Sequence, residues 1–227
     1  MLRARYAQQE VLFPTQWPEV TLAQFQALEP GTSLLLTLAS DPDQLLQLPD
    51  AALDDAVLPH LRFITDVPDF ALLPVPDQFA VTLGEETRLI SRPTDLGLAT
   101  YGQKKTVQEE LRRLLKADRY NYIDAALPLL GVYLYPELSG KPFVDIIDTK
   151  PYEPAILALP CTVALPLAAF FLRNYNALTH SGRVTYELVP EVVTTKRPWW
   201  RQPGQWFRSW RSTRPTSRPT TSPRTAA

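Results

Sequence analysis

The sequence predicts a mainly α-helical protein of the α+β class, with a multi-helix body, one small β-hairpin or minor sheet, and a disordered C-terminal tail. Leucine-rich stripes at helical spacing recur through most of the 227 residues. Twenty-three prolines accompany only 8 glycines, which suits short helices that proline starts, kinks or ends. The last part of the chain has neither an apolar stripe nor an acidic residue, so it cannot build a core.

Composition divides the chain into four parts. Two parts carry helical stripes, the stretch between them contains three prolines and suggests a stiff linker, and the fourth is basic. The sequence leaves open whether the two helical halves form one domain. The parts are an N-terminal strand plus helical half (1–66), a proline-rich linker (67–76), a hairpin plus second helical half (77–195) and a basic tail rich in Trp, Pro and Arg (196–227).

The N-terminal half starts with an extended segment. Residues 3–13 lack a helical stripe and lead to Pro14, so we expect a strand there. Thr21 and Gln24 then fit a capping box, in which each side chain bonds the backbone N–H of the other residue. We interpret Trp17 as a structural anchor. The predicted apolar face of the helix is Leu22, Phe25 and Leu28, and Pro30-Gly31 ends it.

A leucine-rich helical series follows. Asp41-Pro42 has the pattern of a helix start, and Pro59 is expected to kink or divide the last run. The positions predicted to face the core are Leu34, Leu35 and Leu38, then Leu45, Leu46 and Leu48, then Leu53, Val57, Leu58, Leu61 and Ile64.

The second half opens on a hairpin signal. Residues 78–83 and 87–90 are rich in β-forming side chains and flank Gly84-Glu85-Glu86. A glycine supplies the positive φ that such a turn needs. The sequence therefore predicts the small sheet here.

Two helices are predicted after the hairpin. Thr106 and Glu109 fit a second capping box, while Asp118 or Asn121 is expected to cap the next helix, with a kink at Pro128. The predicted apolar faces are Val107, Leu111, Leu114 and Leu115 in the first helix and Ile123, Leu127, Leu130 and Leu134 in the second.

The most hydrophobic stretch is 155–172, which contains no charged residue. Its length alone allows a membrane span, but Pro160 and Pro166 divide it. We therefore expect a buried helix that starts at Pro160 and ends near Gly182. Residues 183–193 have the pattern of an edge strand, because Pro190 excludes a central position in a sheet.

A longer pattern occurs twice. Pro14-Thr15, followed after five residues by Thr21-x-x-Gln24, recurs 79 residues later as Pro93-Thr94 and Thr100-x-x-Gln103. We expect both copies to leave a strand, cap a helix and place the two helical series on a shared core.

No motif in the chain carries catalytic chemistry. It has neither a glycine-rich phosphate loop nor a Gly-x-Ser-x-Gly, His-Glu-x-x-His or paired Cys-x-x-Cys motif. Cys161 is a lone cysteine in an apolar run, His60 and His180 are far apart, and Asp145 with Asp148 suits helix capping. We expect a protein that is not an enzyme, with no cofactor, metal or small-molecule substrate. Without a secretory signal peptide, the expected location is the cytoplasm.

Charge is unevenly distributed. Residues 196–227 contain eight basic and no acidic side chains, whereas the other 195 residues carry a net charge of −9. Such a segment suits an anionic membrane surface, a nucleic acid or an acidic protein, including another copy of this chain; it can also be an extension without function. The candidate partner-binding residues are Trp199, Trp200, Arg201, Trp206, Phe207, Arg208, Trp210 and Arg211.

The stretch from Phe13 to Leu28, with Trp17-Pro-Glu-Val-Thr-Leu-Ala-Gln-Phe25, resembles the opening of small helical proteins encoded among bacteriophage structural genes. The leucine-rich series from Leu34 to Ile64 and the pair Phe170-Phe171 are similar too. Such proteins resemble tail assembly chaperones, which bind the tape-measure protein during tail building. The resemblance implies a protein-binding role, with self-association also open, and no catalytic residues.

Two hypotheses follow for the function. The first is a phage or prophage assembly factor whose helical body binds a tape-measure or other structural protein. The second is a cytoplasmic adaptor whose cationic, Trp-rich tail binds an anionic membrane or nucleic acid. The tail departs from the chaperone pattern: it fits either an extended form of a chaperone that recruits the tape-measure protein or a different kind of protein.

Overall fold

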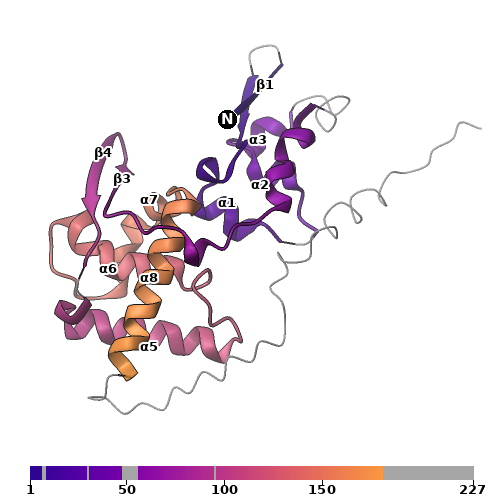
Figure 1. The fold of residues 1–227 in the computed structure, drawn as a ribbon. Helices are drawn as coiled ribbons and strands as arrows, with labels where there is room; N and C mark the ends of the chain where they lie inside the picture. The colour runs from indigo at the N-terminus through magenta and orange to yellow at the C-terminus, as the bar shows by residue number, and fades with distance from the viewer. Residues whose placement is uncertain (7–8, 30, 48–55, 95, 181–227) are drawn as a thin grey trace, which may run out of the picture.

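The computed structural model describes residues 1–6, 9–29, 31–47, 56–94 and 96–180 (Figure 1). The mainly helical α+β fold predicted from the sequence is confirmed within these ranges. The predicted edge strand at 183–193 and the tail at 196–227 lie outside them. The helices are α1 (Leu22–Ala27), α2 (Leu34–Leu38), α3 (Pro42–Leu45), α5 (Tyr101–Lys116), α6 (Ala126–Ser139), α7 (Glu153–Leu157) and α8 (Cys161–His180), and the 3₁₀ helices are η1 (Trp17–Glu19), η3 (Leu58–Thr65), η4 (Phe70–Leu72), η5 (Leu96–Leu98) and η6 (Ile146–Tyr152).

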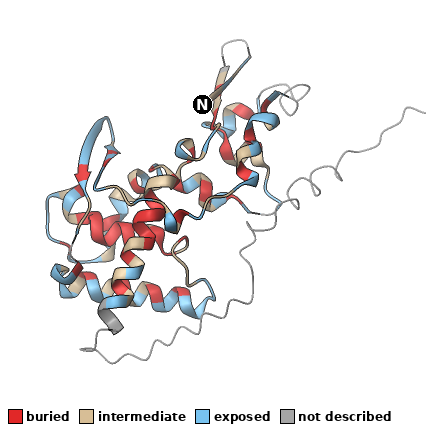
Figure 2. Cartoon of the chain, viewed as in Figure 1, coloured by how far each residue is buried: buried red, intermediate tan, exposed pale blue. Residues whose placement is uncertain are grey.

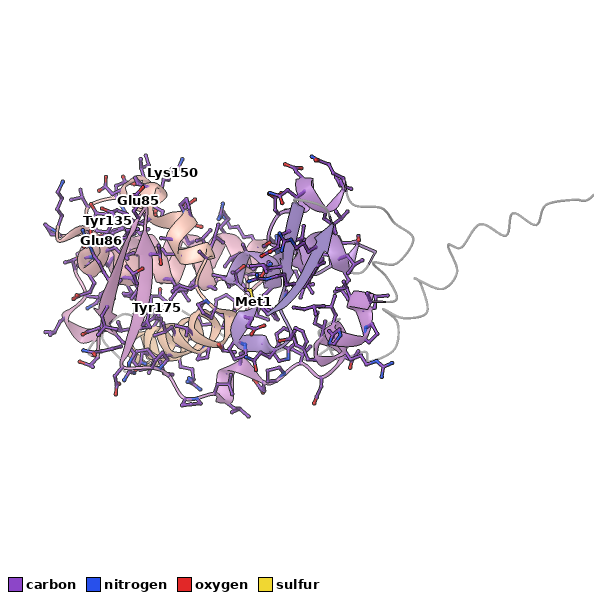
Figure 3. The ribbon with its side chains drawn as sticks, turned by 90° about the horizontal axis from the view of Figure 1, so that it is seen from above. Met1, Glu85, Glu86, Tyr135, Lys150 and Tyr175 are labelled. Atoms are coloured by element: carbon purple, nitrogen blue, oxygen red, sulfur yellow. The ribbon has the colours of Figure 1, made fainter. Side chains whose placement is uncertain are left out.

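Two antiparallel hairpins lie at separate places on the body. Strand β1 (Leu2–Tyr6) pairs with β2 (Gln9–Phe13), and β3 (Gln78–Leu83) pairs with β4 (Glu86–Ser91). In Figure 3, Met1 beside the first hairpin and Glu85 in the turn of the second mark the two positions. The second hairpin confirms the prediction at Gly84, whose φ is +63°. The first hairpin replaces the single extended segment that we expected.

Helices α6 and α8 form the centre of the fold (Figure 2). They pack against each other, and α6 buries residues on all its sides, from Ala126 to Leu138. The expected buried helix is confirmed as α8, which follows Pro160 directly and runs to His180. In the part of the chain that the structure describes, no helix combines the length and apolar content needed to cross a membrane.

One hydrophobic cluster contains residues from both helical halves. The segment expected to be a linker contributes to this cluster, because η4 packs on α8 and buries Phe70 almost completely. The Phe70 ring meets Trp17 edge-on, with centroids 5.5 Å apart, and meets Phe25 at 5.2 Å. Residues 67–76 are therefore part of the packed body within the described structure.

The repeated sequence pattern corresponds to a repeated structural module. Each copy consists of a hairpin, a 3₁₀ turn (η1 or η5) and a capped helix (α1 or α5). Both copies cap a helix as predicted, and both caps are capping boxes, with Thr21 and Gln24 bonded reciprocally and Thr100 and Gln103 bonded in the same way. The two glutamines also act alike: Nε2 of Gln24 donates to the Leu38 carbonyl at 3.0 Å, and Nε2 of Gln103 donates to the Val132 carbonyl at 3.1 Å. Each glutamine thus links its helix start to the next helical element.

Three predictions about helix starts and kinks were wrong. Thr106 lies inside α5 and caps nothing, because the helix already begins at Tyr101. Pro128 lies in the first turn of α6, where its missing N–H costs no helical bond, so it causes no kink. Asn121 accepts from the N–H groups of residues 123 and 124 in the turn before α6, and the helix itself begins at Ala126.

Two further predictions fail in detail. Leu46 and Leu115, which were assigned to apolar core faces, are exposed. The run from Val57 to Ile64 buries the predicted residues Val57, Leu61 and Ile64 but forms the 3₁₀ helix η3, with Pro59 in its first turn. A 3₁₀ helix accommodates a proline at its start without disruption.

We expect Thr21→Ala and Thr100→Ala each to lower the free energy of unfolding by about 1 kcal/mol, because each removes a reciprocal cap. Thr106→Ala is the matched control. Its position is helical without a capping bond, so alanine should be neutral or slightly stabilising there. Chemical denaturation of the three variants measures the difference; equal losses at positions 100 and 106 would contradict the assigned helix start.

Candidate partner-binding surface

All eight partner-binding residues suggested by the sequence lie outside the described residues. They are Trp199, Trp200, Arg201, Trp206, Phe207, Arg208, Trp210 and Arg211.

Cys161 is a core residue at the first position of α8. Its side chain is fully buried, and Sγ lies 3.3 Å from the Trp17 carbonyl, to which it donates. Burial raises the pKa of the Cys161 thiol to about 12. A thiol held neutral in this way is a poor nucleophile and a poor metal ligand.

We expect the contribution of Cys161 to stability to fall at alkaline pH. The pKa of the thiol is higher in the folded state than the value of about 8.5 expected for the unfolded chain. The neutral thiol therefore favours the fold fully below pH 8.5, and this contribution is lost as pH rises toward 12. Unfolding measurements should show the stability gap between wild type and Cys161→Ala narrowing by up to about 1.4 kcal/mol per pH unit above 8.5. A constant gap from pH 7 to 11, or alkylation of Cys161 in the native protein at pH 8, would contradict this.

Asp145 and Asp148, which the sequence assigned to helix capping, form a helix cap in the structure. Asp145 accepts from the N–H of Ile147 at 3.1 Å, and the N–H of Asp145 donates to Asp148 at 3.3 Å. They form the capping box of η6. Among the described residues, no group of three or more His, Cys, Asp or Glu side chains is placed to hold a metal ion.

The clearest candidate surface is apolar and surrounds the first turn of α5. Four large apolar side chains are exposed on the two segments that meet there, residues 98–101 and 144–147, and together we name them the α5 N-terminal patch. Their exposed fractions are 83% for Leu98, 80% for Tyr101, 74% for Val144 and 64% for Ile147. Isolated exposed apolar residues are normal on protein surfaces, but a local group of large ones is typical of interaction sites.

Two segments that are distant in sequence build this patch. Leu98 ends η5 and Tyr101 begins α5, so they flank the Thr100 cap. A Cβ on Gly102 would lie 3.6 Å from the Val144 carbonyl oxygen, which places the segment after α6 against the first turn of α5. Ile147 follows in η6.

The patch has a rigid base and an acidic component. Phe143, the neighbour of Val144, is buried and meets the Tyr135 ring edge-on at 5.9 Å. Gln103 is buried and fixed to α6 through its bond to the Val132 carbonyl. The carboxylates of Asp145 and Asp148 lie in the same segment as Val144 and Ile147. The arrangement can hold an apolar partner that also carries positive charge.

Sequence reasoning missed this surface. Leu98, Tyr101, Val144 and Ile147 are apolar residues like those of the core, and nothing in their identity marks them as exposed. The repeated Thr-x-x-Gln motif does not reveal the surface either, because it places Tyr101 at a helix start equivalent to that of Leu22, which is buried.

Comparison of the chain with models of known protein families, with curated proteins and with solved structures gives no match.

Proposed function

We propose that this protein is a non-catalytic assembly factor of a phage or prophage, resembling a tail assembly chaperone, that binds an apolar helical partner in the host cytoplasm. The α5 N-terminal patch is the observation that supports this proposal best. The resemblance of residues 13–28 to phage assembly proteins suggests the tape-measure protein as the partner. The proposed role needs no cofactor and no small-molecule substrate.

The patch has the properties that capture of an amphipathic helix requires. A few apolar anchors on a rigid base provide most of the binding energy at such surfaces, and the partner helix presents apolar side chains three and four residues apart. Leu98 and Tyr101 are themselves three residues apart. The helix start that carries Tyr101 is held to α6 by the hydrogen bond from Gln103 to the Val132 carbonyl. Covering an exposed apolar stripe of the partner would keep it from aggregating.

The test is co-expression with a phage tape-measure protein. We expect the double substitution Leu98→Ser and Tyr101→Ser to weaken the complex at least tenfold and to lower the yield of soluble tape-measure protein. The positions are exposed, so the free energy of unfolding should change little. Leu72→Ser is the matched control, because Leu72 is equally exposed but lies in η4. Equal binding by wild type and the double variant would refute the proposed role of the patch.

A second candidate function is supported by the charge distribution. Residues 196–227 combine eight basic and no acidic side chains with four tryptophans. Cations interleaved with Trp suit an anionic membrane surface or the phosphates and bases of a nucleic acid. Binding of the full chain to anionic liposomes and to DNA, compared with a chain that lacks residues 196–227, tests this adaptor role. It is wrong if truncation changes neither interaction.

A further inference from the structure

The two hairpins differ in what covers their outer edges. In the first hairpin, both outward backbone groups of Leu12 in β2 are bonded to Ser40. The N–H of Leu12 donates to the Ser40 Oγ at 3.0 Å, and its carbonyl accepts from the Ser40 N–H at 2.9 Å. A backbone edge that is already bonded in this way is blocked against pairing with another chain.

The register of the second hairpin determines which groups of β4 point outward. The N–H of Arg92 donates to the Asp77 carbonyl at 2.8 Å. Successive residues of an antiparallel pair alternate between bonding across the pair and pointing away from it. The backbone groups of Thr87, Leu89 and Ser91 therefore point away from β3. Within the described residues, these outward groups have no hydrogen-bond partner.

Strand β4 is also accessible. Strand β3 contacts α7, whereas β4 lies on the outer side of the hairpin (Figure 1). Within β4 only Ile90 is buried, and Leu89 is 69% exposed. The strand contains neither Lys nor Pro and pairs with β3 without a bulge, so it lacks common features that keep edge strands apart. The outer face of the hairpin carries no charge and consists of Gln78, Ala80, Thr82, Thr87, Leu89 and Ser91.

The order of side chains in β4 suits pairing with a second copy of itself. Two copies can pair β4 antiparallel about a two-fold axis, provided that outward residues lie opposite outward residues. In the register centred on Leu89, Thr87 lies opposite Ser91 of the second copy, so all the outward groups are used. Glu86 then lies opposite Arg92 of the second copy, which places opposite charges across the pair.

The charges disfavour the two neighbouring registers. Moving the centre one residue toward the turn places Arg88 opposite Arg88 of the second copy. Moving it one residue the other way places Arg88 opposite Arg92. Like charges directly opposite each other destabilise a strand pair. In the register centred on Leu89, Arg88 lies opposite Ile90 and keeps its contact with Glu86 of its own copy, at 2.8 Å between Nη2 and Oε2.

We propose that two copies of this chain associate by pairing their β4 strands antiparallel about Leu89. The two-stranded sheets of the two copies then form one continuous four-stranded sheet. Leu89 of each copy packs against Leu89 of the other, which removes both side chains from water. The wider sheet also stabilises each hairpin, because a two-stranded sheet is marginal by itself.

Sedimentation equilibrium of the full chain over a concentration series tests this pairing. A single strand pair is a small interface, so the series extends to about 0.5 mM. The weight-average mass should rise with concentration from 25.7 kDa toward twice that value. Leu89→Lys and Leu89→Glu should each weaken the association about tenfold or more, because each places two like charges opposite each other. Leu89 is exposed, so the free energy of unfolding should change little.

An equimolar mixture of the two variants tests the register. The introduced ammonium and carboxylate groups then lie opposite each other, so the association lost in each variant alone should return. Ala80→Lys is the matched control. Ala80 lies on the same outer face as Leu89 and is its neighbour in β3, away from the paired edge, so this variant should associate like the wild type.

Three results would overturn the proposal. A mass that stays at 25.7 kDa throughout the series would leave the β4 edge to a strand of a different protein. Association that Leu89→Lys does not weaken, or that the mixture does not restore, would place the contact between copies on another surface. None of these measurements includes a tape-measure protein, so their failure is distinguishable from failure of the proposed function.

Discussion

Trp17→Ala is expected to lower the free energy of unfolding by about 3 kcal/mol, the low end of the range for truncating a large aromatic side chain, because Trp17 is only partly buried against the core. Trp17 joins elements that are far apart in the chain: its Nε1 donates to the Asp66 carbonyl at 3.0 Å. Its ring makes edge-on contacts with three phenylalanines, which are Phe25 at 5.9 Å, Phe63 at 5.3 Å and Phe70 at 5.5 Å between centroids.

The loss of unfolding free energy in Trp17→Ala should exceed the part that comes from the buried apolar area of the Trp17 side chain alone. Edge-on aromatic pairs contribute about 0.5–1.5 kcal/mol each beyond burial, and the Asp66 carbonyl loses its donor. Trp17→Phe separates these effects, because it keeps a ring but removes the indole N–H. We expect Trp17→Phe to cost less than half as much as Trp17→Ala.

Urea denaturation followed by far-ultraviolet circular dichroism measures both variants without relying on tryptophan fluorescence. A loss below about 1 kcal/mol for Trp17→Ala would show that Trp17 is not a structural anchor. The residue would then have to be reconsidered as a recognition residue of the phage-like opening.

The helix starts show how far local patterns predict this fold. Thr100-x-x-Gln103 and Thr106-x-x-Glu109 both fit a capping box, and the sequence alone gives no reason to reject either. The structure selects Thr100 because Gln103 is also buried against α6 and bonds the Val132 carbonyl. The deciding contact joins residues 29 positions apart, so a local motif cannot reveal it.

Two other differences have the same origin. The first hairpin was not predicted because Ala7-Gln8, between its strands, lacks the Gly or Asn that marks a tight turn. The proline content of residues 67–76 suggested a linker, whereas Phe70 packs on Trp17, more than 50 positions earlier. A high proline content predicts a stiff backbone, but it does not predict whether the side chains of the segment are buried.

The candidate surface was harder to predict than the fold. Leu22 and Tyr101 hold equivalent places after equivalent caps, yet one is buried and the other exposed. The difference is the segment 159–161, which covers one helix start within the described structure and not the other. Whether an apolar residue is exposed depends on which other segment packs over it. The residue type and its local motif do not predict that packing.

Phe171→Ala is expected to be at least as destabilising as Trp17→Ala, with a loss of about 3–5 kcal/mol. Phe171 is fully buried in α8, and its ring lies 4.9 Å from that of Tyr133 in α6, between centroids. Truncation would leave a cavity between the two central helices, where neighbouring residues are themselves buried and cannot easily relax to fill it.

Phe170→Ala is the matched control, since it removes the same side chain one position earlier in the same helix. Phe170 is only partly buried, and its ring supports the Arg92 guanidinium, whose central carbon lies 4.5 Å from the ring centroid. Losing part of the burial and one cation–π contact should cost about 1–2 kcal/mol. Chemical denaturation of the two variants measures the difference. Similar losses would mean that α8 does not present Phe171 to α6 as its central contact, and the packing of α8 on α6 at the centre of the fold would then be wrong.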